Sequence, residues 1–319
     1  LTLAAAACIC RFDLGRMDRL PHTAGMPNEI IVPRSQRNGY DHALRAAGAK
    51  LIDTGLAERT RDPQRWELAA AVNEKTVAFA YFVGFSQLDL RDVVDVARDH
   101  HLPVIVDASA SLPPRSNLTA FTKAGADLVA YSGGKGIRGP QASGILCGRR
   151  DLIASAALQL LDMDYVNELW NPPESLIDPD IVAGGVPNHG IGRALKVGKE
   201  EIAGLWAALE EFVQGDDEED ARHLREVADQ IVSGLGKLPG LEVRLCVDEP
   251  CWPRVTIHVD SSDGRPSALD LVRQLEEGEP RICVIQAEAR RGILGIDPFG
   301  LEPDDVRRII TRFGDLLQD

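Results

Sequence analysis

The sequence lacks long apolar runs, and basic residues are in the minority. No stretch approaches the roughly 20 apolar residues that a membrane-spanning helix needs, so no membrane association is expected. Acidic residues (49 Asp and Glu) outnumber basic ones (35 Lys and Arg), which gives a formal net charge of −14. Proteins that hold a phosphate backbone usually present a basic face. Nucleic acid is therefore not expected as a partner.

The sequence also lacks any cysteine or histidine spacing typical of a metal site. Its six cysteines form no CxxC pair, and most stand among apolar residues. Reduced cysteines packed as small hydrophobic side chains in a cytoplasmic protein are expected, with no metal. The opening residues 1–10 are Ala-rich and have no basic leader, so they are read as a buried helix. Because no initiator Met is present, the chain is expected to begin inside a longer protein.

Apolar stretches alternate with helix-like stretches over the first two-thirds of the chain. The expected strands are 30–32, 50–53, 76–82, 103–106 and 127–131, and the helices between them are 40–47, 63–72, 90–98 (capped by Asp89) and 118–124. This alternation predicts an α/β fold with a mainly parallel sheet covered by helices on both faces. Ligands of such sheets gather at the carboxyl ends of the strands.

The composition changes after residue 161. Residues 171–190 are rich in Pro, Gly and Asn and are expected to form a long loop, followed by a helix over 197–213 and an acidic turn over 214–220. Short strands and helices over the rest predict a small α+β domain. The expected division is a large domain over 1–195, with its N-terminal part missing, and a small C-terminal domain over 196–319.

One lysine and one aspartate stand where a cofactor site would form. Asp107 ends the apolar stretch 104–107, and Lys135 follows within Ser132-Gly-Gly-Lys-Gly, one helix and one strand later. Pyridoxal 5′-phosphate (PLP) enzymes need a lysine for a Schiff base and a carboxylate for the pyridinium nitrogen. Ser132 is placed for a phosphate contact, and the glycines permit close backbone approach. Taken alone, each residue also fits a purely structural role: Lys135 as a lysine of a surface turn, and Asp107 as a helix-capping aspartate.

The residues around this lysine extend the pattern. The sequence resembles the bacterial selenocysteine synthase family from Ser132 to Leu146 and in the segments 54–60, 83–86, 106–109 and 191–200. That family includes L-seryl-tRNA(Sec) selenium transferase. It also includes relatives that do not act on tRNA, such as D-glucosaminate-6-phosphate ammonia-lyase. The resemblance spans most of residues 1–200 and is closest to the non-tRNA relatives. It implies PLP as cofactor and the fold type I (aspartate-aminotransferase-like) architecture.

By this resemblance Lys135 forms the Schiff base and Asp107 pairs with the pyridinium nitrogen. Ser132 and Ser109 become cofactor contacts, and the ring that stacks on the cofactor is assigned to His42, which lies near Tyr40; a surface or capping role is the alternative for His42. The phosphate loop of the family is expected to precede the given residues, so its residues are unassigned.

The expected substrate-binding residues are mostly arginines, because guanidinium groups match carboxylate and phosphate oxygens. They are Arg37, Arg59, Arg138, Gln141 and Arg193. A solvated surface position is the alternative for each arginine.

The leading functional hypothesis is a PLP-dependent lyase that carries out α,β-elimination on a small-molecule amino acid through a Lys135 aldimine. Selenium transfer on seryl-tRNA, aminotransfer and racemisation remain alternatives, because the same cofactor supports all of them. A catalytically silent relative that binds a partner is the non-enzyme alternative. The resemblance also implies a homodimer or a higher homo-oligomer.

Overall fold

The computed structural model describes residues 1–56, 61–162, 166, 169–187, 189–248 and 252–318. The chain forms two compact units, Leu1–Gln214 and Gly215–Asp319. The first unit extends past residue 195 to include the long helix α9 (Lys199–Gln214). The assignment of a cofactor-binding domain to 1–195 and a small domain to 196–319 stays a prediction.

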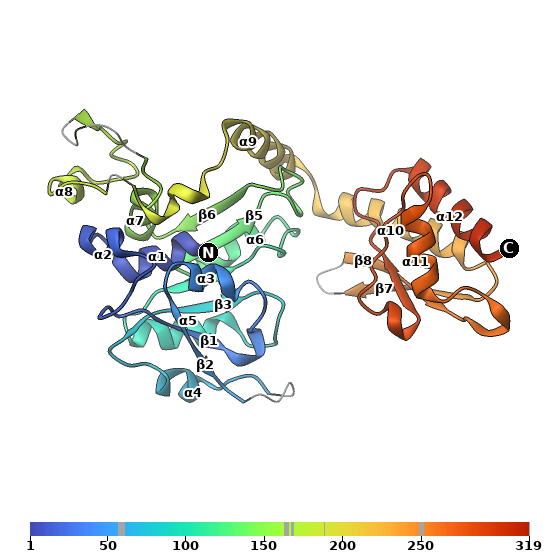
Figure 1. Ribbon diagram of the computed structural model, residues 1–319, viewed down its shortest axis with the longest axis horizontal. Coiled ribbons are helices and arrows are strands. Elements are labelled where there is room, and N and C mark those ends of the chain that lie inside the picture. Colours follow the sequence, from blue (N-terminus) through green and yellow to red (C-terminus); the bar gives the residue numbers. More distant parts are fainter. Residues whose placement is uncertain (57–60, 163–165, 167–168, 188, 249–251, 319) are drawn as a thin grey trace. The chain divides into compact units, whose positions relative to one another are not determined.

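The first unit is built on a six-stranded sheet, shown in blue to green in Figure 1. Its order is β2-β1-β3-β4-β5-β6, and all neighbours are parallel except β5 and β6. The strands are β1 (Glu29–Pro33), β2 (Lys50–Thr54), β3 (Thr76–Phe82), β4 (Val104–Asp107), β5 (Leu128–Ser132) and β6 (Gly144–Gly148). The predicted α/β fold with a mainly parallel sheet is confirmed.

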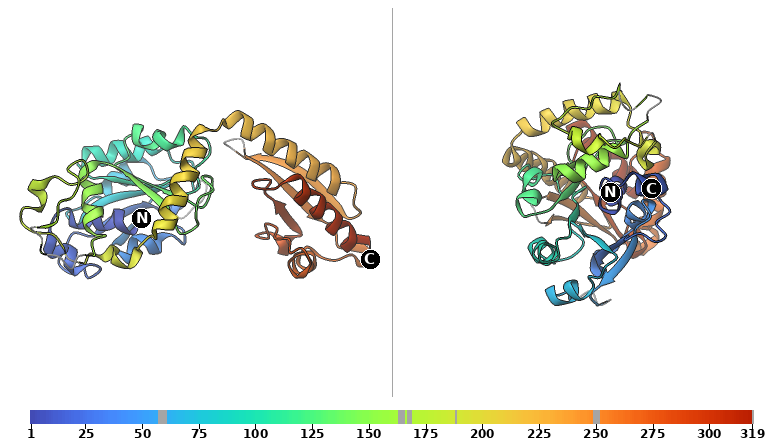
Figure 2. Two further views of the ribbon diagram at one scale, coloured as in Figure 1. Left: turned by 90° about the horizontal axis from the view of Figure 1, so that it is seen from above. Right: turned by 90° about the vertical axis from the view of Figure 1, so that its left-hand side faces the viewer.

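Helices cover both faces of this sheet. One core holds side chains from α1 (Thr2–Cys10), α3 (Asp41–Ala46) and α7 (Arg150–Leu158), and the opposite core holds those from α4 (Arg65–Ala70), α5 (Leu90–Asp99) and α6 (Asn117–Lys123). Figure 2 (left) shows α5 and α6, in teal, on one side of the strands. Every residue of β3 and β4 is buried. This is the expected pattern for central parallel strands covered on both faces.

Local sequence explains several of these elements. The alanines of α1 are fully buried, and their small side chains let the helix approach the sheet closely, as expected for the Ala-rich opening. Asp89 accepts a hydrogen bond from the Arg91 amide at 2.9 Å and begins α5, so the predicted cap is confirmed. A short helix α2 (Leu14–Arg19) follows α1, with Asp13 as its cap.

The sequence did not reveal β6 or α7, which follow the Lys135 segment. β6 is antiparallel to β5, with Ser132 opposite Gly144. Its burial is only partial, so the apolar signal is weaker than in the central strands. The predicted loop over 171–190 contains the short helix α8 (Pro179–Val182), and the 3₁₀ helix η3 (Ile191–Leu195) follows it.

The second unit is a three-stranded antiparallel sheet packed against helices. The strands β7 (Leu241–Asp248), β8 (Trp252–Val259) and β9 (Ile293–Ile296) pair in the order β7-β8-β9. Its core lies between the sheet and α10 (Asp217–Leu235), α11 (Ala268–Glu277) and α12 (Pro303–Gln318). Two 3₁₀ helices, η4 (Ser262–Gly264) and η5 (Ala289–Arg291), connect these elements.

The acidic turn between α9 and α10 is shorter than predicted. Residues 215–216 connect the two helices, and residues 217–220 form the first turn of α10, which Asp216 caps. Acidic side chains at a helix N-terminus are stabilised by its positive dipole end. In the segment 281–285, Ile285 forms an isolated bridge to Gly295. Among the described helices, none combines the length and apolar character needed to cross a lipid bilayer.

Candidate active site

The candidate site lies at the carboxyl edge of the large sheet. The parallel strands β1, β3, β4 and β5 all end there, so the segments that follow them meet at one edge. Asp107 is the last residue of β4, and Ser132 is the last residue of β5. The Lys135 segment therefore begins next to the end of the strand that carries Asp107.

Asp107 is a buried carboxylate at the end of its strand. The residue is 8% exposed, and its Oδ1 accepts a hydrogen bond from the Ser109 amide at 2.9 Å. Within the described chain no hydrogen bond is formed by its Oδ2. A carboxylate oxygen without a hydrogen-bond partner in the protein is able to accept one from a bound molecule. Asp107 can therefore take a donor from a bound molecule.

The lysine segment is a compact, closed loop. The Gly133 amide donates to the Ser143 carbonyl at 3.0 Å, and the Gly139 amide donates to the Gly133 carbonyl at 2.8 Å. Gly136 lies so close to a neighbouring segment that a Cβ there would stand 2.2 Å from the Leu112 carbonyl oxygen. A side chain at position 136 is thus excluded by packing, which explains the glycine beside the lysine.

The amine of Lys135 points toward the end of β4. Its Nζ donates to Ser109 Oγ at 3.3 Å, and it lies 5.8 Å from the centre of the Tyr40 ring. Ser109 thus contacts both predicted catalytic residues, through its hydroxyl to Lys135 and through its amide to Asp107. The structure brings together Lys135, Asp107 and Ser109 as the sequence predicted, while their roles stay predictions.

The aromatic ring near the lysine belongs to Tyr40, whereas the sequence analysis assigned the stacking ring to His42. Tyr40 precedes α3, while His42 lies in its first turn and is exposed. The structure describes no contact between His42 and either Lys135 or Asp107. Since Tyr40 is adjacent to the first helical residue, sequence spacing alone does not say which ring turns toward the site. Stacking by His42 on the cofactor stays a prediction.

Arg37 is held by two carboxylates. Its Nε donates to Asp41 Oδ2 at 2.5 Å, and its Nη1 donates to Asp53 Oδ1. Burial lowers the pKa of Arg37, but the hydrogen bonds to Asp41 and Asp53 outweigh that effect and raise it. These two partners were not predicted from the sequence, although Arg37 and Asp41 are four residues apart, a spacing at which side chains of a helix can form an ion pair. Arg59 lies outside the described residues.

The remaining predicted residues lie around the lysine loop and η3. Gln141 closes the loop through a 2.8 Å hydrogen bond from its Nε2 to the Gly134 carbonyl. Arg138 is exposed and has a positive φ of 62°, and its amide donates to the Lys135 carbonyl. Arg193 forms an ion pair with Asp162 at 2.6 Å. No described contact joins Ser132 to Lys135 or Asp107, and the roles of these four residues stay predictions.

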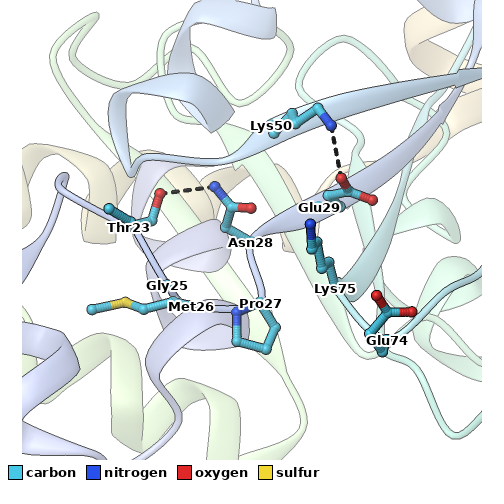
Figure 3. Close-up of a pocket in the computed structure, with 10 residues that line it drawn as sticks. Thr23, Gly25, Met26, Pro27, Asn28, Glu29, Lys50, Glu74 and Lys75 are labelled. Atoms are coloured by element: carbon cyan, nitrogen blue, oxygen red, sulfur yellow. Dashed lines mark hydrogen bonds and ion pairs between the residues drawn. The ribbon is translucent and has the colours of Figure 1, made fainter.

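A separate cavity of about 500 Å³ lies at the opposite edge of the sheet, as Figure 3 shows. It is lined by residues 23–28 and by the amino-terminal ends of β1 and β2. Glu29 is buried there and accepts from Lys50 Nζ at 2.8 Å and from Asn73 Nδ2 at 2.9 Å. These bonds join the amino-terminal ends of neighbouring strands. This cavity is therefore separate from the Lys135 site.

The fold and the carboxyl-edge residues define a class of enzyme. An exposed lysine amine, a buried carboxylate with a free oxygen and an aromatic ring lie at adjoining positions at one sheet edge. PLP requires this combination, a lysine to bond its aldehyde carbon and a carboxylate to hold its ring nitrogen. Within the described residues, no group of three or more His, Cys, Asp or Glu is placed to hold a metal. The residues fit PLP in a fold type I enzyme.

Comparisons with known proteins agree with this class. The family profile of SelA, L-seryl-tRNA selenium transferase, matches residues 41–163. A 5′-C-glycyluridine monooxygenase-decarboxylase from a Streptomyces species is 30% identical over the whole chain and 74% of its own length. A D-glucosaminate-6-phosphate ammonia lyase from Salmonella typhimurium is 30% identical over the whole chain and 78% of its length.

A solved structure of D-glucosaminate-6-phosphate ammonia-lyase has the same fold. It aligns with a TM-score of 0.74 and 29% identity over 99% of this chain and 78% of the other. The chain belongs to the SelA family of PLP-dependent enzymes. These similarities confirm the predicted family, the fold type I architecture and PLP as the cofactor. They also confirm the prediction of a PLP-dependent enzyme of the lyase type.

Proposed function

We propose that this enzyme carries out an α,β-elimination of the ammonia-lyase type on a hydroxy amino acid. The observation that carries the proposal is the contact of the exposed Lys135 amine with Ser109, beside the buried Asp107. It is supported by the similarity along the whole chain to an ammonia lyase that acts on D-glucosaminate 6-phosphate. Sugar-derived amino acids with an acidic group are thus the proposed substrate class.

Lys135, Asp107 and Ser109 have different roles in the proposed reaction. PLP, when bound, supplies an electron-withdrawing ring that accepts the electron pair left at the substrate Cα. Lys135 would hold the cofactor through its Nζ and would take the Cα proton of the substrate on the same atom. Asp107 would hold the protonated ring nitrogen, and Ser109, which contacts both side chains, would orient them. Loss of the β-hydroxyl as water, followed by hydrolysis, gives a 2-keto acid and ammonia.

The direct test uses the Lys135→Ala variant. Purified wild-type protein incubated with PLP is expected to show the visible absorbance band of lysine-bound PLP, and the variant is expected to lose it together with ammonia release. Lys123→Ala, an exposed lysine of α6, serves as the matched control and is expected to keep both. A panel of hydroxy amino acids assayed for ammonia and 2-keto acid identifies the substrate. Wild-type protein that takes up no PLP would exclude the proposal.

Selenium transfer to seryl-tRNA is the second candidate, because the SelA profile matches residues 41–163. The acidic net charge of −14 disfavours it, since tRNA binding depends on basic surfaces. A gel shift with tRNA separates the two candidates. Tight, salt-sensitive binding would favour the transferase. Amino-group exchange with a keto acid, or inversion at Cα without ammonia, would instead indicate aminotransfer or racemisation.

We also propose that the enzyme is a homodimer or a higher homo-oligomer in the cytoplasm. Fold type I sites usually form where two subunits meet, and this is the support for the proposal. Light scattering on the purified protein measures the state directly. A monomeric enzyme that retains full activity would contradict the proposed oligomer while leaving the proposed chemistry in place.

A further inference from the structure

Four charged side chains form a connected group at the carboxyl ends of β1 and β2, next to Tyr40. This group, here named the Arg37 clamp, consists of Arg34, Arg37, Asp41 and Asp53. Arg34 and Arg37 follow β1, Asp53 lies near the end of β2, and Asp41 begins α3. Asp41 follows directly after Tyr40 in the chain, and the Tyr40 ring centre lies 5.8 Å from the Lys135 amine.

The two carboxylates that hold Arg37 differ in their surroundings. Asp41 is 5% exposed and binds the Nε edge of the guanidinium at 2.5 Å, whereas the Asp53 side chain is 31% exposed and binds Nη1. Asp53 has a second cation, since its Oδ2 lies 3.7 Å from Arg34 Nε. Asp41 therefore holds Arg37 from a buried position. Asp53 is accessible, and it can remain paired with Arg34 when its contact with Arg37 is lost.

Asp41 binds Arg37 through one of its two oxygens. Its Oδ2 accepts from Arg37, while its Oδ1 is buried and has no hydrogen-bond partner among the described residues. Its Oδ2 binds the Nε edge of the guanidinium, so a buried carboxylate sets the orientation of the guanidinium plane.

We propose that the Arg37 clamp binds the acidic group of the substrate by exchange. The carboxylate or phosphate of the substrate takes the place of Asp53 at Arg37 Nη1, and Asp53 stays paired with Arg34. Asp41 keeps the guanidinium oriented throughout, and no covalent bond changes. This inference rests on the proposed function, for which it supplies an acid-binding site on the segment that carries Tyr40. An arginine suits this site because its planar fork matches either oxyanion.

The exchange predicts opposite effects for the two sides of the clamp. Asp53→Asn removes the competing charge, so anions are expected to bind about five-fold more tightly, the scale of one partly exposed ion pair. Arg37→Gln removes the binding group, so affinity is expected to fall about 10- to 100-fold. In the double variant R37Q/D53N the gain from D53N is expected to disappear. If Asp53 only stabilised the loop, D53N would weaken anion binding.

The experiment measures dissociation constants of sodium phosphate and sodium acetate for PLP-treated full-length protein. Each constant is obtained from the rise of Tm with anion concentration at constant ionic strength. Asp99→Asn, an exposed residue at the end of α5, is the matched control for the loss of one negative charge and is expected to bind like the wild type. Tighter phosphate than acetate binding assigns the clamp to a phosphate ester, and the reverse order assigns it to a carboxylate.

The outcomes separate this inference from the proposed function. The PLP absorbance band is read first on each sample, and its absence from the wild type contradicts the proposed function alone. The differences between variants are read on the same samples in either case. Equal affinities in wild type and R37Q, or equal values in D53N and D99N, would overturn the clamp while leaving the PLP chemistry intact.

Discussion

At the scale of single residues, the site combines side chains that are distant in the chain. Lys135 and Asp107 are 28 positions apart, yet Ser109 contacts both of them. Asp107 and Lys135 could be identified from the sequence, because Asp107 stands at the end of a predicted strand and Lys135 stands in a glycine-rich loop. The ring of Tyr40 and the carboxylate partners of Arg37 could not, since their directions depend on the path of the segment after β1.

That path is determined by long-range hydrogen bonds. Gln36 is fully buried, and its Oε1 accepts from the Phe82 amide at 2.9 Å while its Nε2 donates to Ser86 Oγ at 3.0 Å. These bonds tie the segment after β1 to the end of β3. No local periodicity carries such information, so the sequence identified a set of candidate rings and arginines without showing which ones face the lysine.

Thiol reactivity gives a prediction at the same scale. Burial raises the pKa of Cys8 and Cys10 to about 12, so both thiols remain protonated at pH 8, while Cys283 is exposed. Because the thiolate is the reactive form, iodoacetamide is expected to label Cys283 in the native protein and to spare Cys8 and Cys10. Mass spectrometry of the labelled protein reads this out, with urea-unfolded protein as the control. Early labelling of Cys8 would contradict the buried position of α1.

At the scale of elements, central strands were easier to predict than peripheral ones. The stretch 76–82 matches β3 to the residue, because a strand covered on both faces is apolar throughout. β6 was missed because it is half-buried and follows the closed lysine loop. Burial on both faces gives a strong sequence signal, whereas an antiparallel edge strand carries a weak one.

The amino-terminal edge of the sheet supplies a prediction on pH. The hydrogen bond from Lys50, aided by Asn73, holds the pKa of Glu29 below its ordinary value. A group with a lowered folded pKa stabilises the protein above its unfolded pKa, and this contribution is lost as the pH falls through the folded value. Glu29→Gln is thus expected to lower the free energy of unfolding by about 1–3 kcal/mol at pH 7, and by much less at pH 3.

Urea unfolding of both proteins at the two pH values tests this expectation. Glu74→Gln is the matched control, because Glu74 is an exposed residue of the same cavity (Figure 3). It removes one negative charge without breaking the bonds between β1, β2 and the segment before β3. A loss of stability that is the same at pH 3 and pH 7 for Glu29→Gln would argue for packing and against the ion pair.

At the scale of the whole molecule, the chain is two units with separate cores. The core of residues 215–319 consists of apolar side chains from α10, α11, α12 and the sheet, including Ile231, Ile257, Leu271 and Phe313, all fully buried. A unit with its own core is able to fold alone. The sequence predicted a small α+β region here, but the helix α9 belongs to the first unit in the structure.

Independent folding of the second unit can be measured. The fragment 215–319 is expected to show helical circular dichroism and one cooperative thermal transition, because its core is complete within the fragment. The substitution Phe313→Ala in that fragment is expected to cost about 3–5 kcal/mol, the usual penalty for emptying a buried aromatic position. Gradual unfolding of the parent fragment would show that it depends on residues 1–214.

The sequence by itself determined the α/β class, the central strands and the positions of Lys135 and Asp107. These follow from local rules: apolar periodicity, strand ends and glycine spacing depend on neighbours in the chain. The tertiary structure alone decided that Tyr40 faces the Lys135 amine and that Asp41 and Asp53 hold Arg37. Those contacts join segments whose relative positions are set by the packing of adjacent strands, and only the folded chain brings them within reach.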